Sequence, residues 1–215
     1  AREIETITSN KRPIVILKKN DNYNFPESLS PGLHNIGVML PYSPMHYLLF
    51  DEGDIDTYVM TSANIPGEPM MIKNEDIING VNDYSLVHNR KILNRCDDSV
   101  IRFRNNELSF IRRSRGYTPE PYTINYEVND SNVLALGPEL DVTFSIAKDN
   151  IVYPSQHIGN TNKPKTLEFL KQAIENMERI TKINEFDVVA CDLHPHFFTT
   201  RLAYDLAEKY GAEVK

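Results

Sequence analysis

Residues 133–211 carry the pattern that most restricts the fold, because strand-like and helix-like segments follow one another there in a regular order. The region begins with three short apolar runs, which are followed by a long amphipathic segment. A fourth apolar run and a second amphipathic segment come next, and the connections between all of them are short and polar. The predicted order is therefore strand, strand, strand, helix, strand, helix. The strands are expected at 133–137, where the strand ends in glycine, and at 143–148, 151–155 and 187–191.

The two helices of this region are predicted from spacing and from end signals. In the first, apolar residues recur at intervals of three and four, which places them on one face of a helix. Thr199 is expected to cap the second helix, and Gly211 to end it. The apolar face of the first helix is expected to consist of Leu167, Leu170, Ile174, Met177 and Ile180.

This order of elements is similar to the first part of a ribonuclease-H-like domain, the kind found in pairs in actin-like ATPases.

Upstream of this region, strands are predicted at 14–17, 36–40 and 58–60, and short helices are predicted at 45–50 and 75–81. Asn74 is expected to cap the second of these helices. Asn105-Asn106 between two apolar runs predicts a hairpin turn. A proline-rich stretch, 117–121, reads as a linker.

Composition narrows the functional classes. The net charge of −7 argues against broad nucleic-acid binding, and no run of about 18 apolar residues is present to cross a membrane. Residues 101–116 nevertheless hold five arginines against one acid, which suits a small anionic ligand or simply a solvated strand face. Cys96 and Cys191 form no metal-type pair and are expected to be free thiols in a reducing cytosol.

A polar segment, 61–69, follows the apolar run 58–60 and turns through Pro66 and Gly67. The hydroxyls of Thr61 and Ser62 and the amide of Asn64 can hydrogen-bond a phosphate, a ribose or a carbonyl without adding charge. An adenylating enzyme is one interpretation, and an ordinary strand-to-turn transition is the other.

The chain resembles the HypF carbamoyltransferase family, which makes the cyanide-ligand precursor for the maturation of nickel–iron hydrogenases. The matching segments run in order through almost the whole sequence. They are residues 12–15, 31–33, 36–42, 60–64, 88–90, 95–100, 112–117, 155–159 and 192–195.

The resemblance implies a mixed α/β (α+β) fold in two parts. Residues 1–125 look like the later part of a YrdC-like domain, a twisted mixed sheet with helices. Residues 126–215 look like the first ribonuclease-H/actin-like lobe of a transferase domain. The segments expected before and after these parts are absent, so the chain is expected to be a fragment that is inactive, or nearly so, by itself.

The resemblance also implies an activity. Carbamate released from carbamoyl phosphate would be adenylated with ATP and Mg²⁺, and the carbamoyl group would pass to the C-terminal cysteine of HypE. Full-length relatives would also hold Zn²⁺ and a transferase-domain metal, through ligands outside this chain. Neither nucleic acid nor membrane is an expected partner, and a cytoplasmic location is expected.

The same resemblance indicates which residues act. ATP and adenylate contacts are expected from a hydroxyl-and-amide loop, from three arginines, whose planar guanidinium groups bind phosphate well, and from a glycine at the first turn of the actin-like lobe. Transferase residues are expected at the end of its last buried strand. The candidates are Thr61, Ser62, Asn64, Arg95, Arg113, Arg115 and Gly137 for ATP, and Asp192 and His194 for transfer; no metal ligands are expected in this chain.

Several alternatives stay open. Asp97 or Asp98 is either a Mg²⁺ ligand or a turn acid, and Cys96 is read as a buried thiol rather than a nucleophile. Gln156 and His157 are either cleft residues or packing residues. For the whole chain, the alternatives are a threonylcarbamoyl-adenylate synthase of tRNA modification and a non-catalytic module that docks HypE or another maturation protein.

Overall fold

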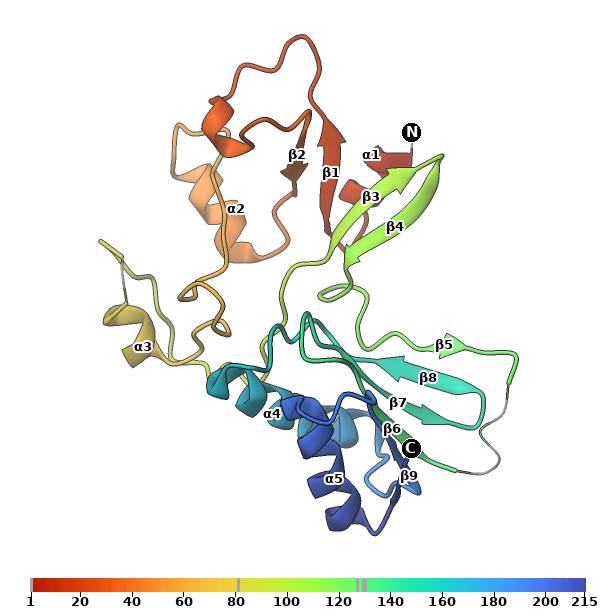
Figure 1. Cartoon of the computed structure of the whole chain (residues 1–215). Coiled ribbons are helices and arrows are strands. Elements are labelled where there is room, and N and C mark those ends of the chain that lie inside the picture. The colour runs from red at the N-terminus through yellow and green to blue at the C-terminus, as the bar shows by residue number, and fades with distance from the viewer. Residues whose placement is uncertain (1, 81, 127, 129–130) are drawn as a thin grey trace. The chain divides into compact units, whose positions relative to one another are not determined.

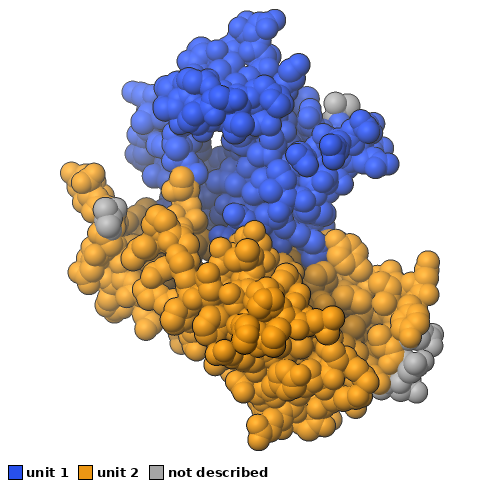
Figure 2. All heavy atoms as spheres, in the orientation of Figure 1, with its two compact units in different colours: residues 1–60, 97–117 blue, residues 61–96, 118–215 orange. Residues whose placement is uncertain are grey.

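The computed structural model describes residues 2–80, 82–126, 128 and 131–215. Two compact units are formed (Figures 1 and 2): residues 1–60 with 97–117, called unit 1, and residues 61–96 with 118–215, called unit 2. The fold is mixed α/β with one mixed sheet in each unit, as predicted. The predicted domain boundary at residue 125 stays a prediction.

Unit 1 is built on a four-stranded sheet in the order β2-β1-β3-β4. The first strand pairs antiparallel with the second and parallel with the third, so Val15 lies beside Ile101 in the middle, and both side chains are fully buried. The predicted hairpin is confirmed, since Asn105 and Asn106 adopt positive φ angles between β3 and β4. The strands are β1 (Ile14–Lys18), β2 (Asn35–Val38), β3 (Val100–Arg104) and β4 (Glu107–Arg112).

Unit 1 also contains α1 (Arg2–Thr8), a 3-10 turn η1 (Glu27–Leu29) and α2 (Pro44–Asp51). The predicted helix at 45–50 is confirmed as α2, and Ser43 caps it by accepting a hydrogen bond from the His46 N–H.

The predicted strand at 58–60 is wrong. Val59 is 73% exposed, and residues 58–60 join neither sheet. The Tyr58 ring instead packs edge-on against Phe50 of α2, and its hydroxyl donates to the Leu49 carbonyl. Contact with a helix therefore takes the place of strand pairing for this short apolar run.

Unit 2 carries a six-stranded sheet in the order β10-β9-β6-β7-β8-β5 (Figure 1). The predicted order of three strands, a helix, a strand and a helix is confirmed: β6, β7 and β8 are antiparallel and β9 is parallel to β6, while the parallel β10 after α5 was not predicted. The strands are β5 (Tyr122–Thr123), β6 (Val133–Leu136), β7 (Phe144–Lys148), β8 (Ile151–Pro154), β9 (Val188–Ala190) and β10 (Glu213–Val214).

The core of unit 2 lies between this sheet and the helices α4 (Pro164–Thr181) and α5 (Phe198–Tyr210). Leu170, Ile174 and Met177 are buried against Phe144 and other sheet residues, as the spacing predicted. Burial of each such side chain contributes roughly 1.5–3 kcal/mol. Ile180 was predicted on the same face but is 52% exposed. It lies in the last turn of α4, which ends at Thr181 and extends beyond the buried core.

Residues 61–96 join unit 2 as a long segment whose described residues are mostly irregular and include the short helix α3 (Asn74–Ile78). The prediction that Asn74 caps this helix is wrong, since Lys73 is the capping residue and Asn74 is already helical. The Asn74 amide instead donates to the His88 carbonyl across the segment. The predicted helix extended to Val81, which lies outside the described residues.

None of the described helices has the length and apolar character that crossing a membrane requires.

Candidate functional site

The hydroxyl-and-amide loop at 61–71 is organised by the side chain of Asn64. The Asn64 Nδ2 donates to the carbonyls of Ile65 and Glu68, at 3.1 and 3.0 Å. The Asn64 Oδ1 accepts from the Ser62 hydroxyl at 2.6 Å. Ser62 and Asn64 are thus brought together as the motif predicted, and their bonds to one another fix the shape of the loop.

Backbone hydrogen bonds close the same loop. The Met71 N–H donates to the Ala63 carbonyl at 2.9 Å, and the Glu68 N–H donates to the Ile65 carbonyl at 2.8 Å. Thr61 and Ser62 remain exposed at its entrance. The loop therefore presents neutral hydroxyl groups on a fixed backbone, which suits hydrogen bonding to a phosphate or a ribose.

Arg95 is held inside unit 2. Its Nε donates to the Met70 carbonyl at 2.7 Å, its Nη1 donates to Gln172 Oε1 at 3.2 Å, and its guanidinium lies 5.2 Å from the centre of the Phe169 ring. Burial lowers the pKa of Arg95, against the opposing effect of Asp76. These contacts join residue 95 to the loop and to α4, and its predicted contact with phosphate stays a prediction.

Arg115 is the centre of a hydrogen-bonded cluster in unit 1. Its Nε donates to Asp98 Oδ1 at 2.6 Å, and its two terminal nitrogens donate to the carbonyls of Lys11 and Arg12. The guanidinium also lies 3.5 Å from the centre of the Tyr42 ring. Burial raises the pKa of Tyr42, and the Asp98 charge raises it further. Asp98 is therefore an ion-pair partner of Arg115 in this structure.

A buried serine pair fixes the backbone around this cluster. The Ser99 hydroxyl donates to the Arg115 carbonyl at 2.9 Å and accepts from the Ser114 N–H at 2.8 Å, and both serines are fully buried. Arg113, which directly precedes Ser114, is partly buried.

The hypothesis that Ser62 and Asn64 of unit 2 meet the arginines of unit 1 at one nucleotide stays a prediction.

The first turn of the actin-like lobe is shaped by Gly137. A Cβ at this position would come within 2.6 Å of the Thr143 carbonyl oxygen, so only glycine fits the close approach of the two backbones. The Gly137 N–H donates to the same oxygen at 3.0 Å. This packing accounts for the glycine, and its predicted role in nucleotide binding stays a prediction.

Glu139, two residues later, caps α5 from a distance. Its carboxylate accepts from the Phe198 N–H at 2.8 Å, at the N-terminus of a helix whose own cap residue, Phe197, provides no side-chain bond. The prediction that Thr199 caps this helix is therefore wrong. Thr199 is fully buried in the first turn, where its side chain packs inward. The predicted end at Gly211 is confirmed by its positive φ.

Replacing Glu139 with Ala is expected to lower the free energy of unfolding by about 1 kcal/mol, because a helix cap and a favourable dipole contact are lost. Urea denaturation followed by circular dichroism measures the change. Glu139→Gln keeps an acceptor oxygen and should lose less. Glu208→Ala, at an exposed position of α5, is the control, and an equal loss there would contradict the capping role.

Asp192 and His194 lie in a compact turn that follows β9. The Asp192 Oδ1 accepts from the His194 N–H at 2.8 Å, and the His194 Nδ1 accepts from the His196 N–H at 3.3 Å. The His194 ring stacks on Phe197 at 4.2 Å between centroids. Thr200 ties the turn to α5 by donating to the carbonyls of Asp192 and His194. In this arrangement the neutral imidazole of His194 carries its proton on Nε2.

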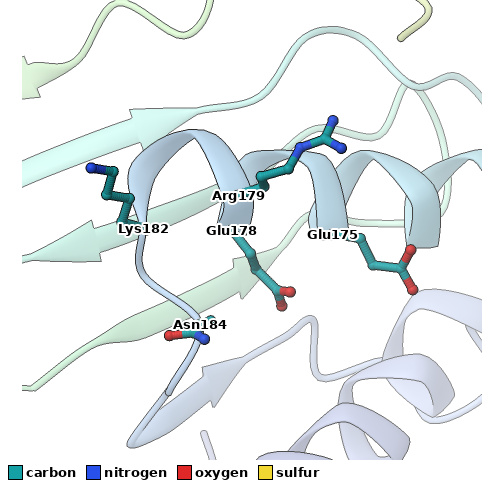
Figure 3. A pocket seen from close by; sticks show the side chains of 5 residues that line it. All are labelled: Glu175, Glu178, Arg179, Lys182 and Asn184. Atoms are coloured by element: carbon teal, nitrogen blue, oxygen red, sulfur yellow. The ribbon is translucent and has the colours of Figure 1, made fainter. Parts of the chain in front are cut away.

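A shallow, open pocket lies at the C-terminal end of α4 (Figure 3). It is lined by Glu175, Glu178, Arg179, Lys182 and Asn184. Glu178 and Glu175 extend to one side of the helix and Arg179 to the other, so the charged groups do not converge. Burial raises the pKa of Tyr210, and the hydrogen bond that its hydroxyl donates to Glu178 raises it further. No group of three or more His, Cys, Asp or Glu is arranged to hold a metal ion within the described part of the chain.

Four residues of the site region escaped prediction or were left open. Tyr42, Ser99 and Thr200 were not singled out, because their contacts lie far along the chain or in a neighbouring element. Gln156 was left open between cleft and packing, and it is buried with its amide on Asn94 and Arg95.

Comparisons with known proteins agree with this architecture. Residues 2–114 match the Sua5/YciO/YrdC family model, described as telomere recombination, and residues 128–215 match the HypF Kae1-like domain. A probable carbamoyltransferase HypF of Methanocaldococcus jannaschii is 49% identical over 99% of this chain and 28% of its own length. A carbamoyltransferase HypF of Synechocystis is 36% identical over 95% of this chain and 27% of its own length.

Two solved structures share the fold. The crystal structure of T. kodakarensis HypF has a TM-score of 0.93 and 48% identity, covering all of this chain and 28% of that one. A full-length HypF in the phosphate- and nucleotide-bound form has a TM-score of 0.88 and 34% identity, covering all of this chain and 33% of that one. The chain thus spans about a third or less of these relatives. It belongs to the HypF carbamoyltransferase family, as a Sua5/YciO/YrdC-type region followed by a Kae1-like region.

Proposed function

We propose that the chain is the nucleotide-handling part of a carbamoyltransferase that adenylates carbamate with ATP and passes the carbamoyl group to the C-terminal cysteine of HypE. The product would serve cyanide-ligand synthesis for a nickel–iron hydrogenase. The observation that carries the proposal is identity of 49% to a probable carbamoyltransferase HypF over almost the whole chain. A relative of the same fold solved with phosphate and nucleotide bound supports it further.

Water hydrolyses carbamoyl phosphate to carbamate, with inorganic phosphate as the leaving group, and in the first step an oxygen of this carbamate attacks the α-phosphorus of ATP. The bond from that phosphorus to the bridging oxygen breaks, and pyrophosphate leaves; Mg²⁺ bound to ATP would offset part of its charge. Positioning and charge stabilisation are the protein's contribution to such a step. The proposal assigns nucleotide contacts to Thr61, Ser62 and Asn64, and charge stabilisation to Arg113.

In the second step the acceptor cysteine reacts as a thiolate, its proton having gone to water. The sulfur bonds to the carbamoyl carbon, the bond from that carbon to the phosphate oxygen breaks, and AMP leaves. His194 is assigned to donate from Nε2 to the carbamoyl oxygen as negative charge develops there. Asp192 holds the His194 backbone by the 2.8 Å bond described above.

Calorimetric titration with ATP and Mg²⁺ tests the first step. Replacing Ser62 with Ala is expected to weaken ATP binding about tenfold, because a hydroxyl donor and its bond to Asn64 are both lost. Ser85→Ala, another exposed loop serine of unit 2, is the matched control. Equal affinities for wild type and Ser62→Ala would contradict the assignment.

Turnover is tested in a hybrid protein in which this chain replaces the matching stretch of the Methanocaldococcus jannaschii relative. We expect pyrophosphate release that requires both ATP and carbamoyl phosphate. A hybrid that folds and binds ATP but releases no pyrophosphate would contradict the proposed reaction.

A threonylcarbamoyl-adenylate synthase is the second candidate, favoured by the Sua5/YciO/YrdC match over residues 2–114. Pyrophosphate release that depends on threonine and bicarbonate, in place of carbamoyl phosphate, would support it.

A further inference from the structure

Residues 61–96 occupy an unusual position between the two family regions. The Sua5/YciO/YrdC match includes them, yet in three dimensions they pack with residues 118–215, most of which match the Kae1-like domain (Figure 2). The loop that carries Ser62 and Asn64 therefore belongs to one family region and is supported by the other.

Two lysines at the start of α4 hold the turn of this loop. Lys163 Nζ donates to the Pro66 carbonyl at 3.2 Å, and Lys165 Nζ forms an ion pair with Glu68 at 2.7 Å. The Glu68 carbonyl is itself one of the two acceptors of the Asn64 amide. Lys165 thus contacts Glu68 itself, and Lys163 contacts Pro66, the neighbour of Ile65, whose carbonyl is the other acceptor of the Asn64 amide.

Gln156 holds the other end of the segment. Its side chain is 4% exposed and follows β8, and its Nε2 donates to Asn94 Oδ1 at 3.3 Å and to the Arg95 carbonyl at 3.2 Å. Because both partners are acceptors, a buried amide donor is what this position requires.

Arg95 connects this anchor to the loop. It binds the Met70 carbonyl through Nε, and the next residue, Met71, donates its N–H to Ala63, between Ser62 and Asn64. A continuous set of contacts therefore runs from Gln156 through residues 94–95 and 70–71 to the loop, with Gln172 and Phe169 of α4 supporting the guanidinium.

We propose that Gln156, Lys163 and Lys165 of the Kae1-like region are positioning residues for the Ser62–Asn64 loop, so that one family region sets the nucleotide-binding geometry of the other. The inference deepens the proposed function and rests on it for its consequence for ATP. Its structural part, that these residues order the loop, is testable without nucleotide.

Amide hydrogen exchange of the full chain measures the order of the loop. Gln156→Leu removes both donated bonds and leaves two acceptors unsatisfied, so exchange at the Met71 and Glu68 amides is expected to accelerate about tenfold. Exchange in the β6–β7 core should stay unchanged. Unchanged exchange at both loop amides, with the core intact, would overturn the inference.

A surface pair keeps the inference testable if the Gln156 variant does not fold. Lys165→Glu faces Glu68 with a like charge and should accelerate loop exchange about threefold, as expected for an exposed ion pair. The double variant Lys165→Glu with Glu68→Lys should restore the wild-type rate. Lys171→Glu, at an exposed position of the same helix, is the control. Failure of the double variant to restore the rate would argue against positioning by this pair.

ATP titration then separates the two hypotheses. Weaker ATP binding in Lys165→Glu, recovered in the charge-exchanged double variant, is expected if the loop is the nucleotide site. Changed exchange with no ATP binding by wild type would overturn the proposed function and leave the positioning role standing. ATP binding that is unaffected in every variant, with unchanged exchange, would overturn the inference alone.

Discussion

Replacing Arg115 with Ala is expected to lower the free energy of unfolding by about 2–3 kcal/mol, one of the two largest effects predicted for this chain. The change leaves the Asp98 carboxylate without its ion pair and the carbonyls of Lys11 and Arg12 without their guanidinium donors. The stacked Tyr42 ring loses its cation partner as well. Because the Arg115 and Asp98 side chains are 21% and 25% exposed, solvent screens part of the ion pair.

Urea denaturation followed by circular dichroism gives the unfolding free energy, and amide exchange in β1 and β3 shows whether the loss belongs to unit 1. Arg102→Ala, an exposed arginine of β3, is the matched control and should change stability by less than about 0.5 kcal/mol. A loss for Arg115→Ala as small as that of the control would contradict a structural role for the cluster.

Arg115→Lys refines the same test. A lysine keeps the positive charge but lacks the planar guanidinium that donates to Asp98 and to two backbone carbonyls at once. Most of the stability loss should therefore remain. If the ATP affinity is also measured, Arg113→Lys should weaken binding, because charge stabilisation is assigned to the Arg113 guanidinium. The pair of variants thereby distinguishes an arginine that holds the fold from one that holds the ligand.

The parts of the fold that could be predicted depend on local patterns. The spacing of Leu170, Ile174 and Met177 predicts α4, and the adjacent asparagines 105 and 106 predict the hairpin, because each signal is contained in a few neighbouring residues. The run 58–60 looked equally apolar, but a strand also needs a partner, and none is encoded locally.

Long-range contacts account for the remaining differences. The N-terminus of α5 is capped by Glu139, which accepts a hydrogen bond from the Phe198 N–H, 59 residues later in the sequence. Thr199, which lies beside that N–H in the sequence, is fully buried. In the candidate site, the Ser62–Asn64 pair was predictable because its two members are neighbours. The bonds from Gln156 to Arg95 and from Lys163 to Pro66 join residues 61 and 97 positions apart, and no spacing rule reveals such contacts.

Replacing Asn64 with Ala is expected to weaken ATP binding about 50-fold, the largest functional effect predicted here, because a ligand contact and the support of the loop are lost together. The variant removes two donated bonds, to the Ile65 and Glu68 carbonyls, and the acceptor of the Ser62 hydroxyl. Since the loop is exposed, the unfolding free energy should fall by less than about 1 kcal/mol. Calorimetry of the chain and pyrophosphate release by the hybrid protein provide the two measurements.

Asn64→Asp separates the two contributions. The aspartate keeps the acceptor for Ser62 but cannot donate to either carbonyl, and its negative charge opposes an approaching phosphate, so ATP binding should fall as far as in the alanine variant. Asn82→Ala is the control, because Asn82 is an exposed asparagine of the 61–96 segment whose amide likewise donates to a loop carbonyl, that of Tyr84. Equal ATP affinity in the Asn64 and Asn82 variants would mean that the hydroxyl-and-amide loop does not bind the nucleotide, whatever order it has.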